Sequence, residues 1–405
     1  MRYHGPTLRF LGLIGCFTSA CFLPAYASEV RPTLPPFEHA YEPRDLDERG
    51  LWQKWDEYEK EFARSPAVYH APDLVNYVKG VLCETVGPDR CGATRIYIVR
   101  DISFNASMAP NGIMSVNTGL LLRVKNEAEL ASVLGHEFAH FEQRHSLNSF
   151  KKRRRGSDLV SWMTIAAGVS IAASGSGGYQ HHRDYRTSIY GDVYRYKRDQ
   201  ERESDILSSQ YLVISPYSSA AAAHVWLRLL DEDAEQARER KRSRRRQWTG
   251  WADSHPSSFE RADYLSRLAD EANDEGVYKT SEYVEAIGPH LPEFFDDQLQ
   301  RNDFSATKFL LEQIAQDGWT PDLLFLQGEL YRKRGNPRDL VTAATAYLNA
   351  IEAGYGNANA WRGLGLSQMR SGAQAEGRQA LQTYISMAPD APDASMMIML
   401  IGEEQ

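Results

Sequence analysis

The chain has 405 residues, of which 42% are hydrophobic and 25% are charged, and its formal net charge at pH 7 is −8. No apolar run reaches the roughly 20 residues that a membrane-spanning helix needs. We therefore expect no membrane-spanning helix in the chain after the predicted signal peptide.

The first 27 residues have the pattern of a secretory signal peptide. Arg2 and Arg9 precede an apolar run over residues 10–23, and small residues at the end of this segment predict cleavage after Ala27. A lipoprotein box ending at Cys16 is the alternative, but it leaves only a handful of apolar residues before the cysteine. We expect an exported protein with a net charge of −10 after cleavage, because the signal carries two basic residues and no acidic one.

Two cysteines, Cys83 and Cys91, follow the signal peptide. In an oxidising compartment, a pair that closes a short loop predicts a disulfide. Two unpaired buried thiols are the alternative.

Hydrophobic spacing predicts helices and strands before residue 125. The predicted helices cover residues 46–62 and 73–85, and the predicted strands cover residues 95–99 and 113–122. The second strand should pair with the segment near residues 105–108 through the turn Pro110-Asn111-Gly112. An exposed edge of this sheet could hold an extended peptide by strand addition, or the strands could only cover the core.

The pattern H-E-x-x-H, formed by His136, Glu137 and His140, lies in a helix predicted to open at residue 126 or 127. Each helical residue advances about 100°, so both histidines lie on one face, roughly 40° apart, and can bind one zinc ion. Glu137 lies beside them, where it can reach a water molecule. His145 should point about 140° from the ligand face, so we expect it to pack or to form a structural hydrogen bond.

A second acidic motif, E-x-E-x-D, is formed by Glu201, Glu203 and Asp205. On a helix Glu201 and Asp205 share one face, whereas Glu203 points roughly 160–200° away. Catalytic zinc sites have three protein ligands and one open position, so we predict Glu201 as the third ligand. Asp205 is placed to accept an N–H from a ligating imidazole. A solvated acidic helix start is the alternative.

Three further segments have competing interpretations. The apolar run over residues 159–173 could cover the active site or rest on a membrane, or it could be an ordinary buried helix. His181 and His182 lack helical spacing to a third ligand and are expected to be solvated. The basic run over residues 237–246 could contact anionic lipid, although a solvated helix end is the default interpretation. Nucleic acid is not an expected partner, because an exported protein seldom meets it.

The sequence around the two motifs resembles the HtpX-like and BepA-like metallopeptidases, the family that includes the CaaX prenyl endopeptidases. The resemblance rests on GHEFAHFEQRH, on ERESD some sixty residues later, on the preceding NASMAPNGIMSVNTGLL and on the helical tail, so it covers nearly the whole chain. It implies zinc ligation by His136, His140 and Glu201, with Glu137 as general base. Ser204 stands where the family usually has alanine.

The resemblance also implies roles for His255 and Arg261. The family has a His-Pro pair followed by an arginine, present here as His255-Pro256 and Arg261. In the resembling enzymes the loop with this histidine lies over the zinc, so His255 is expected to act as a switch or a transition-state donor, and Arg261 to belong to the catalytic site. The alternative for His255 is a simple helix-start residue before Pro256.

From about residue 293 the chain has a helical-repeat pattern. Gly328 and Gly365 mark equivalent positions in two units, and Tyr347 to Trp361 keeps the phase of a 34-residue tetratricopeptide period. A three-residue insertion near residues 336–340 explains the longer glycine spacing. Such a small number of repeats cannot bury its own apolar faces well, so we expect the repeats to dock on the preceding domain. They could offer a concave partner-binding surface, or they could brace the catalytic cleft.

The expected fold class is α+β, predominantly α. We expect a signal peptide over residues 1–27, a zincin-type metallopeptidase domain with a small antiparallel sheet over residues 28–280, and a tetratricopeptide-like helical domain over residues 281–405.

The expected function is that of a zinc endopeptidase with one Zn²⁺ per chain. The resemblance implies a periplasmic location, envelope proteins as substrates, and a role in protein quality control or outer-membrane assembly with partners held by the repeats. A non-catalytic chaperone with a latent zinc site and a membrane-surface binder are the alternatives.

Overall fold

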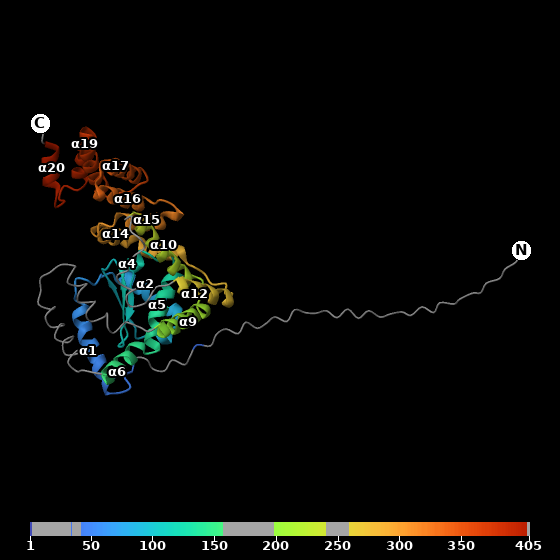
Figure 1. Cartoon of the computed structure of the whole chain (residues 1–405). Coiled ribbons are helices and arrows are strands. Elements are labelled where there is room, and N and C mark those ends of the chain that lie inside the picture. Colours follow the sequence, from blue (N-terminus) through green and yellow to red (C-terminus); the bar gives the residue numbers. More distant parts are fainter. Residues whose placement is uncertain (2–33, 35–41, 157–197, 240–258, 403–405) are drawn as a thin grey trace. The chain divides into compact units, whose positions relative to one another are not determined.

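The computed structural model describes Met1, Leu34 and residues 42–156, 198–239 and 259–402 (Figure 1). The predicted signal peptide, the apolar run over residues 159–173, His181, His182, the basic run after residue 239, and His255 lie outside the described residues. The described part is mostly helical and has one small sheet. None of its helices combines the length and the hydropathy of a membrane span.

Two predicted helices precede the sheet. Helix α1 (Leu46–Phe62) begins at Asp45, whose side chain accepts a hydrogen bond from the Glu48 N–H. Helix α2 (Pro72–Val86) buries one apolar face. The predicted disulfide is present, and it joins Cys83 of α2 to Cys91 of the short helix α3 (Pro88–Cys91).

The sheet contains three strands in the order β1-β3-β2. They are β1 (Arg95–Val99), β2 (Ala106–Met108) and β3 (Ile113–Asn117). Strands β2 and β3 are antiparallel, as predicted, with Ser107 opposite Ser115. Strand β1 is parallel to β3, with Ile98 opposite Val116. The sheet is therefore mixed rather than antiparallel. The reason is that β3 lies between the other two strands, so β1 and β2 pair with opposite edges of it.

The second predicted strand is shorter than expected. It ends at Asn117, and helix α4 (Thr118–Leu121) follows directly. A Cβ atom on Gly119 would lie 2.2 Å from the Ile102 carbonyl carbon, so the two backbones meet where the strand turns into a helix. This close contact requires glycine.

Helix α5 (Glu127–Glu142) lies at the centre of the core. It begins at Asn126, whose side chain accepts from the Glu129 N–H, and every residue from Glu127 to Phe141 is buried. Helix α2 packs against it, as do α9 (Arg198–Ile214) and α10 (Ala221–Glu239). A Cβ on Gly135 would lie 3.0 Å from Ser208 Oγ, so glycine allows the close approach of α9. Helix α6 (His145–Gly156) follows α5, and α12 (Phe259–Ala272) packs on α9 and α10.

The described part of the chain after residue 279 consists of helices joined by short loops. Its helices are α13 (Thr280–Ile287), α14 (Leu291–Gln300), α15 (Phe304–Ile314), α16 (Pro321–Arg334), α17 (Pro337–Glu352), α18 (Asn359–Ser371), α19 (Gln374–Met387) and α20 (Ala394–Gly402), with 3₁₀ turns at Gly288–His290 and Ala315–Asp317. The first of them contact the earlier part, since Arg100 forms a two-bond ion pair with Asp297 and the Tyr283 hydroxyl donates to the Leu121 carbonyl over 2.5 Å.

The glycines of the predicted repeats hold equivalent positions. A Cβ on Gly328 of α16 would lie 2.6 Å from Tyr347 Cε1 on α17, and a Cβ on Gly365 of α18 would lie 2.7 Å from Leu381 Cγ on α19. Each glycine therefore admits a large side chain from the second helix of its pair. Tyr347 also meets the next pair, because a Cβ on Gly363 would lie 2.3 Å from its Cζ. The assignment of these pairs to the tetratricopeptide class stays a prediction.

Gly363→Ala is expected to lower the free energy of unfolding by about 1–3 kcal/mol, because the added methyl group overlaps the Tyr347 ring. The ring is fully buried and its hydroxyl donates to Glu329 over 2.6 Å, so it has little room to move. Urea denaturation measures the change. The control is Gly356→Ala, where no atom lies within 4 Å of the new Cβ, and a change within about 0.5 kcal/mol is expected. Equal effects of the two substitutions would contradict the packing argument.

Candidate metal centre

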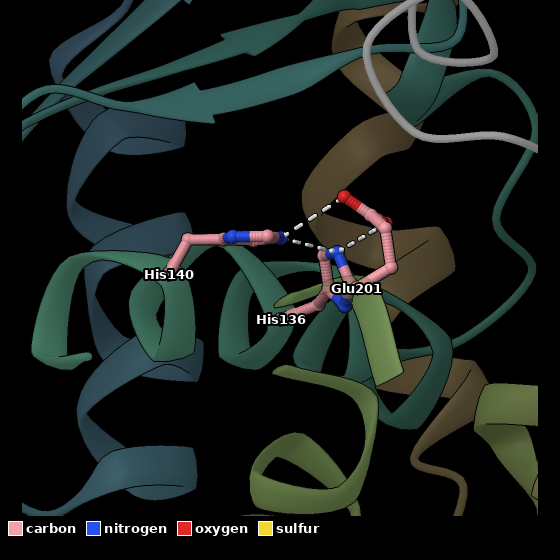
Figure 2. A group of neighbouring side chains, drawn as sticks. All are labelled: His136, His140 and Glu201. Atoms are coloured by element: carbon pink, nitrogen blue, oxygen red, sulfur yellow. Dashed lines mark hydrogen bonds and ion pairs between the residues drawn. The ribbon is translucent and has the colours of Figure 1, made fainter. Parts of the chain in front are cut away.

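Three buried side chains from α5 and α9 point toward one another (Figure 2). His136 Nε2 lies 3.1 Å from His140 Nε2. The Glu201 carboxylate oxygens lie 3.6 Å from His136 Nε2 and 3.4 Å from His140 Nε2. Each of these side chains is at most 5% exposed. The three residues predicted as ligands are therefore together in the core.

The donor separations fit a single bound metal ion. For zinc bonds of about 2.0–2.1 Å, tetrahedral geometry places neighbouring donor atoms about 3.3–3.4 Å apart. The three measured separations, 3.1, 3.4 and 3.6 Å, bracket this value. Two histidines with one glutamate also form a donor set of catalytic metal sites, in which the fourth position stays open.

Glu137 follows the first ligand on α5 and is completely buried. On a helix its side chain projects about 100° from that of His136, so it lies beside the donor set and not within it. This placement agrees with the predicted division between two imidazole ligands and one neighbouring carboxylate.

Asp205 contacts the imidazole of His136 on the side away from the other two predicted ligands, as its spacing predicts. Its Oδ1 lies 2.9 Å from His136 Nδ1, so it can accept the N–H of this ring while Nε2 faces the other donors. Burial alone lowers the pKa of His136, but the neighbouring Asp205 more than reverses this effect and raises the pKa to about 9. The Asp205 carboxylate therefore stabilises the protonated form of the His136 ring.

Arg261 of α12 connects Glu201 and Asp205, two of the acidic residues of α9. Its Nη1 donates to Glu201 over 3.0 Å, and its Nε and Nη2 donate to Asp205 over 2.9 and 2.5 Å. The guanidinium is buried and lies 4.1 Å from the centre of the Trp226 ring. Burial raises the pKa of the Asp205 carboxyl, but Arg261 and His136 outweigh burial and hold it well below its usual range. Tyr264 also donates to Asp205.

His145 lies much closer to the ligands than helical spacing predicts. Its Nδ1 is 2.9 Å from Nδ1 of His140, so the expectation that it points away from the ligand face is wrong, although a hydrogen bond was expected. The physical reason is Arg144, whose φ of 56° ends α5 and turns the chain back before α6 begins. Left-handed backbone is uncommon for arginine, so the sequence gives no signal for this turn.

The remaining sequence-predicted site residue, His255, lies outside the described residues. Its expected position over the metal therefore stays a prediction that follows from the resemblance.

The donor set and the H-E-x-x-H helix are those of a metallopeptidase. Comparison with known sequences agrees with this class, since residues 72–269 match the profile of Peptidase family M48. This range contains the three predicted ligands and the residues described in this section that contact them. The chain thus carries an M48 metallopeptidase domain, and the predicted relationship to BepA-like metallopeptidases is confirmed.

Several named proteases are similar to the chain. A protein of Vibrio cholerae, named for a proposed role as a beta-barrel assembly-enhancing protease, is 28% identical over 231 residues, which are 56% of this chain and 46% of that protein. The mitochondrial metalloendopeptidase OMA1 of Schizosaccharomyces pombe is 26% identical over 62% of this chain and 68% of its own length. The beta-barrel assembly-enhancing protease of Escherichia coli is 23% identical over 44% and 37%. The chain thus spans less than half the length of the beta-barrel assembly-enhancing relatives.

Arg261→Lys is expected to weaken zinc binding by about 10- to 100-fold, because an ammonium group keeps the charge but cannot donate to Glu201 and Asp205 in the same fork. Competition with a chromophoric chelator measures the affinity. The control is Arg267→Lys on the same helix, where the arginine side chain is 65% exposed and pairs with Asp263. Parent-like zinc affinity in Arg261→Lys would show that Arg261 does not support the ligands.

Proposed function

We propose that the chain is a zinc-dependent endopeptidase that hydrolyses peptide bonds of proteins, with one Zn²⁺ per chain. The observation that carries this proposal is the convergence of two imidazole nitrogens and one carboxylate at 3.1–3.6 Å, with the buried Glu137 beside them. The M48 domain and the protease names of the relatives support it.

In this proposal His136, His140 and Glu201 hold the zinc. A zinc ion at this position would polarise the scissile carbonyl and lower the pKa of a water to about 7. Glu137 takes a proton from the attacking water and passes it to the leaving amine. Glu137 is completely buried, so its carboxylate is shielded from bulk water.

The surrounding residues of the proposed site fix the ligands. Asp205 accepts the His136 N–H and thereby keeps the lone pair of Nε2 available. Arg261 orients the Glu201 and Asp205 carboxylates. We retain His255 as a proposed switch or transition-state donor, on the basis of the family resemblance and the His-Pro pair.

We further propose that the enzyme acts in the periplasm on envelope proteins, in quality control or outer-membrane assembly. The support is the signal-peptide pattern, the disulfide, which suits an oxidising compartment, and the relatives named beta-barrel assembly-enhancing proteases. The paired helices after residue 320 are proposed to hold substrates or partners of the assembly machinery.

Glu137→Gln is expected to retain about one zinc per chain and to lose about 100- to 10,000-fold in the rate of casein hydrolysis, because the amide cannot accept the water proton. His255→Ala is measured in parallel, with zinc content determined for each protein. Faster hydrolysis by His255→Ala would identify this histidine as a brake. The exposed substitution Glu376→Gln serves as the control. Absence of cleavage by the parent and by His255→Ala, with one zinc bound to each, would favour the non-catalytic chaperone instead.

Removal of zinc by a chelator is expected to destabilise the folded chain as well as inactivate it. A ligand present at about 1,000 times its Kd stabilises the folded state by about 4 kcal/mol, and this contribution is lost with the ion. Thermal unfolding with and without chelator measures the loss, and added Zn²⁺ should restore both stability and hydrolysis. In His140→Ala the chelator should have little effect. Equal chelator sensitivity in this variant would place the ion elsewhere.

A further inference from the structure

We propose that His145 is a positioning residue for the metal site, and that Glu203, His145 and His140 form a hydrogen-bonded relay which fixes how His140 presents Nε2 to the metal. This inference rests on the proposed zinc site but concerns two residues outside the ligand set.

The contacts form a continuous chain from a ligand to the surface. Nδ1 of His140 lies 2.9 Å from Nδ1 of His145, and Nε2 of His145 lies 3.2 Å from Oε2 of Glu203. The two imidazole rings are inclined at 70° with their centres 5.0 Å apart. His145 is 4% exposed, whereas the Glu203 side chain is 54% exposed. Both rings are therefore held in the core, and only the carboxylate end meets solvent.

The positions of the protons follow from the bonding of the ligand. A nitrogen that binds a metal carries no proton, so the neutral ring of His140 carries its proton on Nδ1 and donates it to His145. Nδ1 of His145 must then be the acceptor, which places the proton of His145 on Nε2, facing the Glu203 carboxylate. Only one arrangement of protons satisfies both contacts. Ser204 Oγ, 3.4 Å from His145 Nδ1, can donate to the same acceptor.

Helical geometry explains why a histidine lies between the carboxylate and the ligand. Asp205 reaches His136 directly because it shares a face of α9 with Glu201. Glu203 points roughly 160–200° away from Glu201 on α9, and its carboxylate contacts His145. His145 spans the gap, because the turn at Arg144 returns the chain beside its own helix.

A second contact fixes this turn. The Arg144 guanidinium donates to Glu48 of α1, and Lys151 of α6 pairs with the same carboxylate over 2.5 Å. The Glu48 side chain is itself buried. Helix α1 thus holds both ends of the segment that presents His145, so the relay depends on a rigid support and not on a surface loop.

The test measures zinc affinity in the full chain by chelator competition, together with the visible spectrum of the Co²⁺ form. His145→Phe keeps a ring but removes both nitrogens, and its zinc Kd is expected to rise by about 10- to 100-fold with an altered cobalt spectrum. His145→Asn keeps an acceptor near the position of Nδ1 and should recover most of this loss. Parent-like zinc affinity and cobalt spectrum in His145→Phe would overturn the relay.

Glu203→Gln provides the second variant if His145→Phe does not fold. Its half-exposed side chain can change without loss of packing, and it should raise the zinc Kd by less than about tenfold, because the amide oxygen still accepts but carries no charge. A Kd equal to those of the parent and of Glu376→Gln would overturn the relay.

If the parent itself binds no zinc, the proposed function and the relay both fall. If the parent binds zinc and cleaves casein while both relay variants match it, only the relay falls.

Discussion

The burial of two carboxylates beside two imidazoles depends on one guanidinium. Removing an ionised carboxylate from water costs several kcal/mol unless an opposite charge and well-placed hydrogen bonds compensate it. Arg261 meets both acids from a single planar group, and the Trp226 ring covers one of its faces. Because Arg261 comes from α12 and the acids from α9, this contact also joins two helices. The site and the packing around it are therefore stabilised by the same interaction.

The proposed ligands could be predicted from the sequence because helix geometry places the members of each motif on one face of their own helix. His136 and His140 are four residues apart on one helix, and so are Glu201 and Asp205 on another. Within a helix this spacing fixes a common face, whatever the rest of the fold does. The choice of Glu201 as third ligand needed only the chemistry of zinc sites. The structure brings these side chains together, with Asp205 behind the first ligand.

Other features could not be predicted, because they depend on how the chain changes direction. The strands were recognised from their residues, but nothing in their pattern placed β1 and β2 on opposite sides of β3. Helical extrapolation failed at Arg144, since a single left-handed residue redirected His145 toward the metal site. Arg261 was expected only through the family resemblance. Its contact with Glu201 spans sixty residues and requires the packing of α12 on α9, which no local pattern encodes.

The ring of Tyr347 makes the residue types at positions 328, 347 and 363 depend on one another. It occupies space that a side chain on Gly328 or on Gly363 would need, so neither glycine can enlarge while the tyrosine remains. A smaller residue in place of Tyr347 would free that space but leave a cavity between the helix pairs. Substitutions at these positions are consequently non-additive, and single steps away from the present combination are unfavourable. Related chains should therefore exchange the three residues together, so that their covariation records the contact between neighbouring helix pairs.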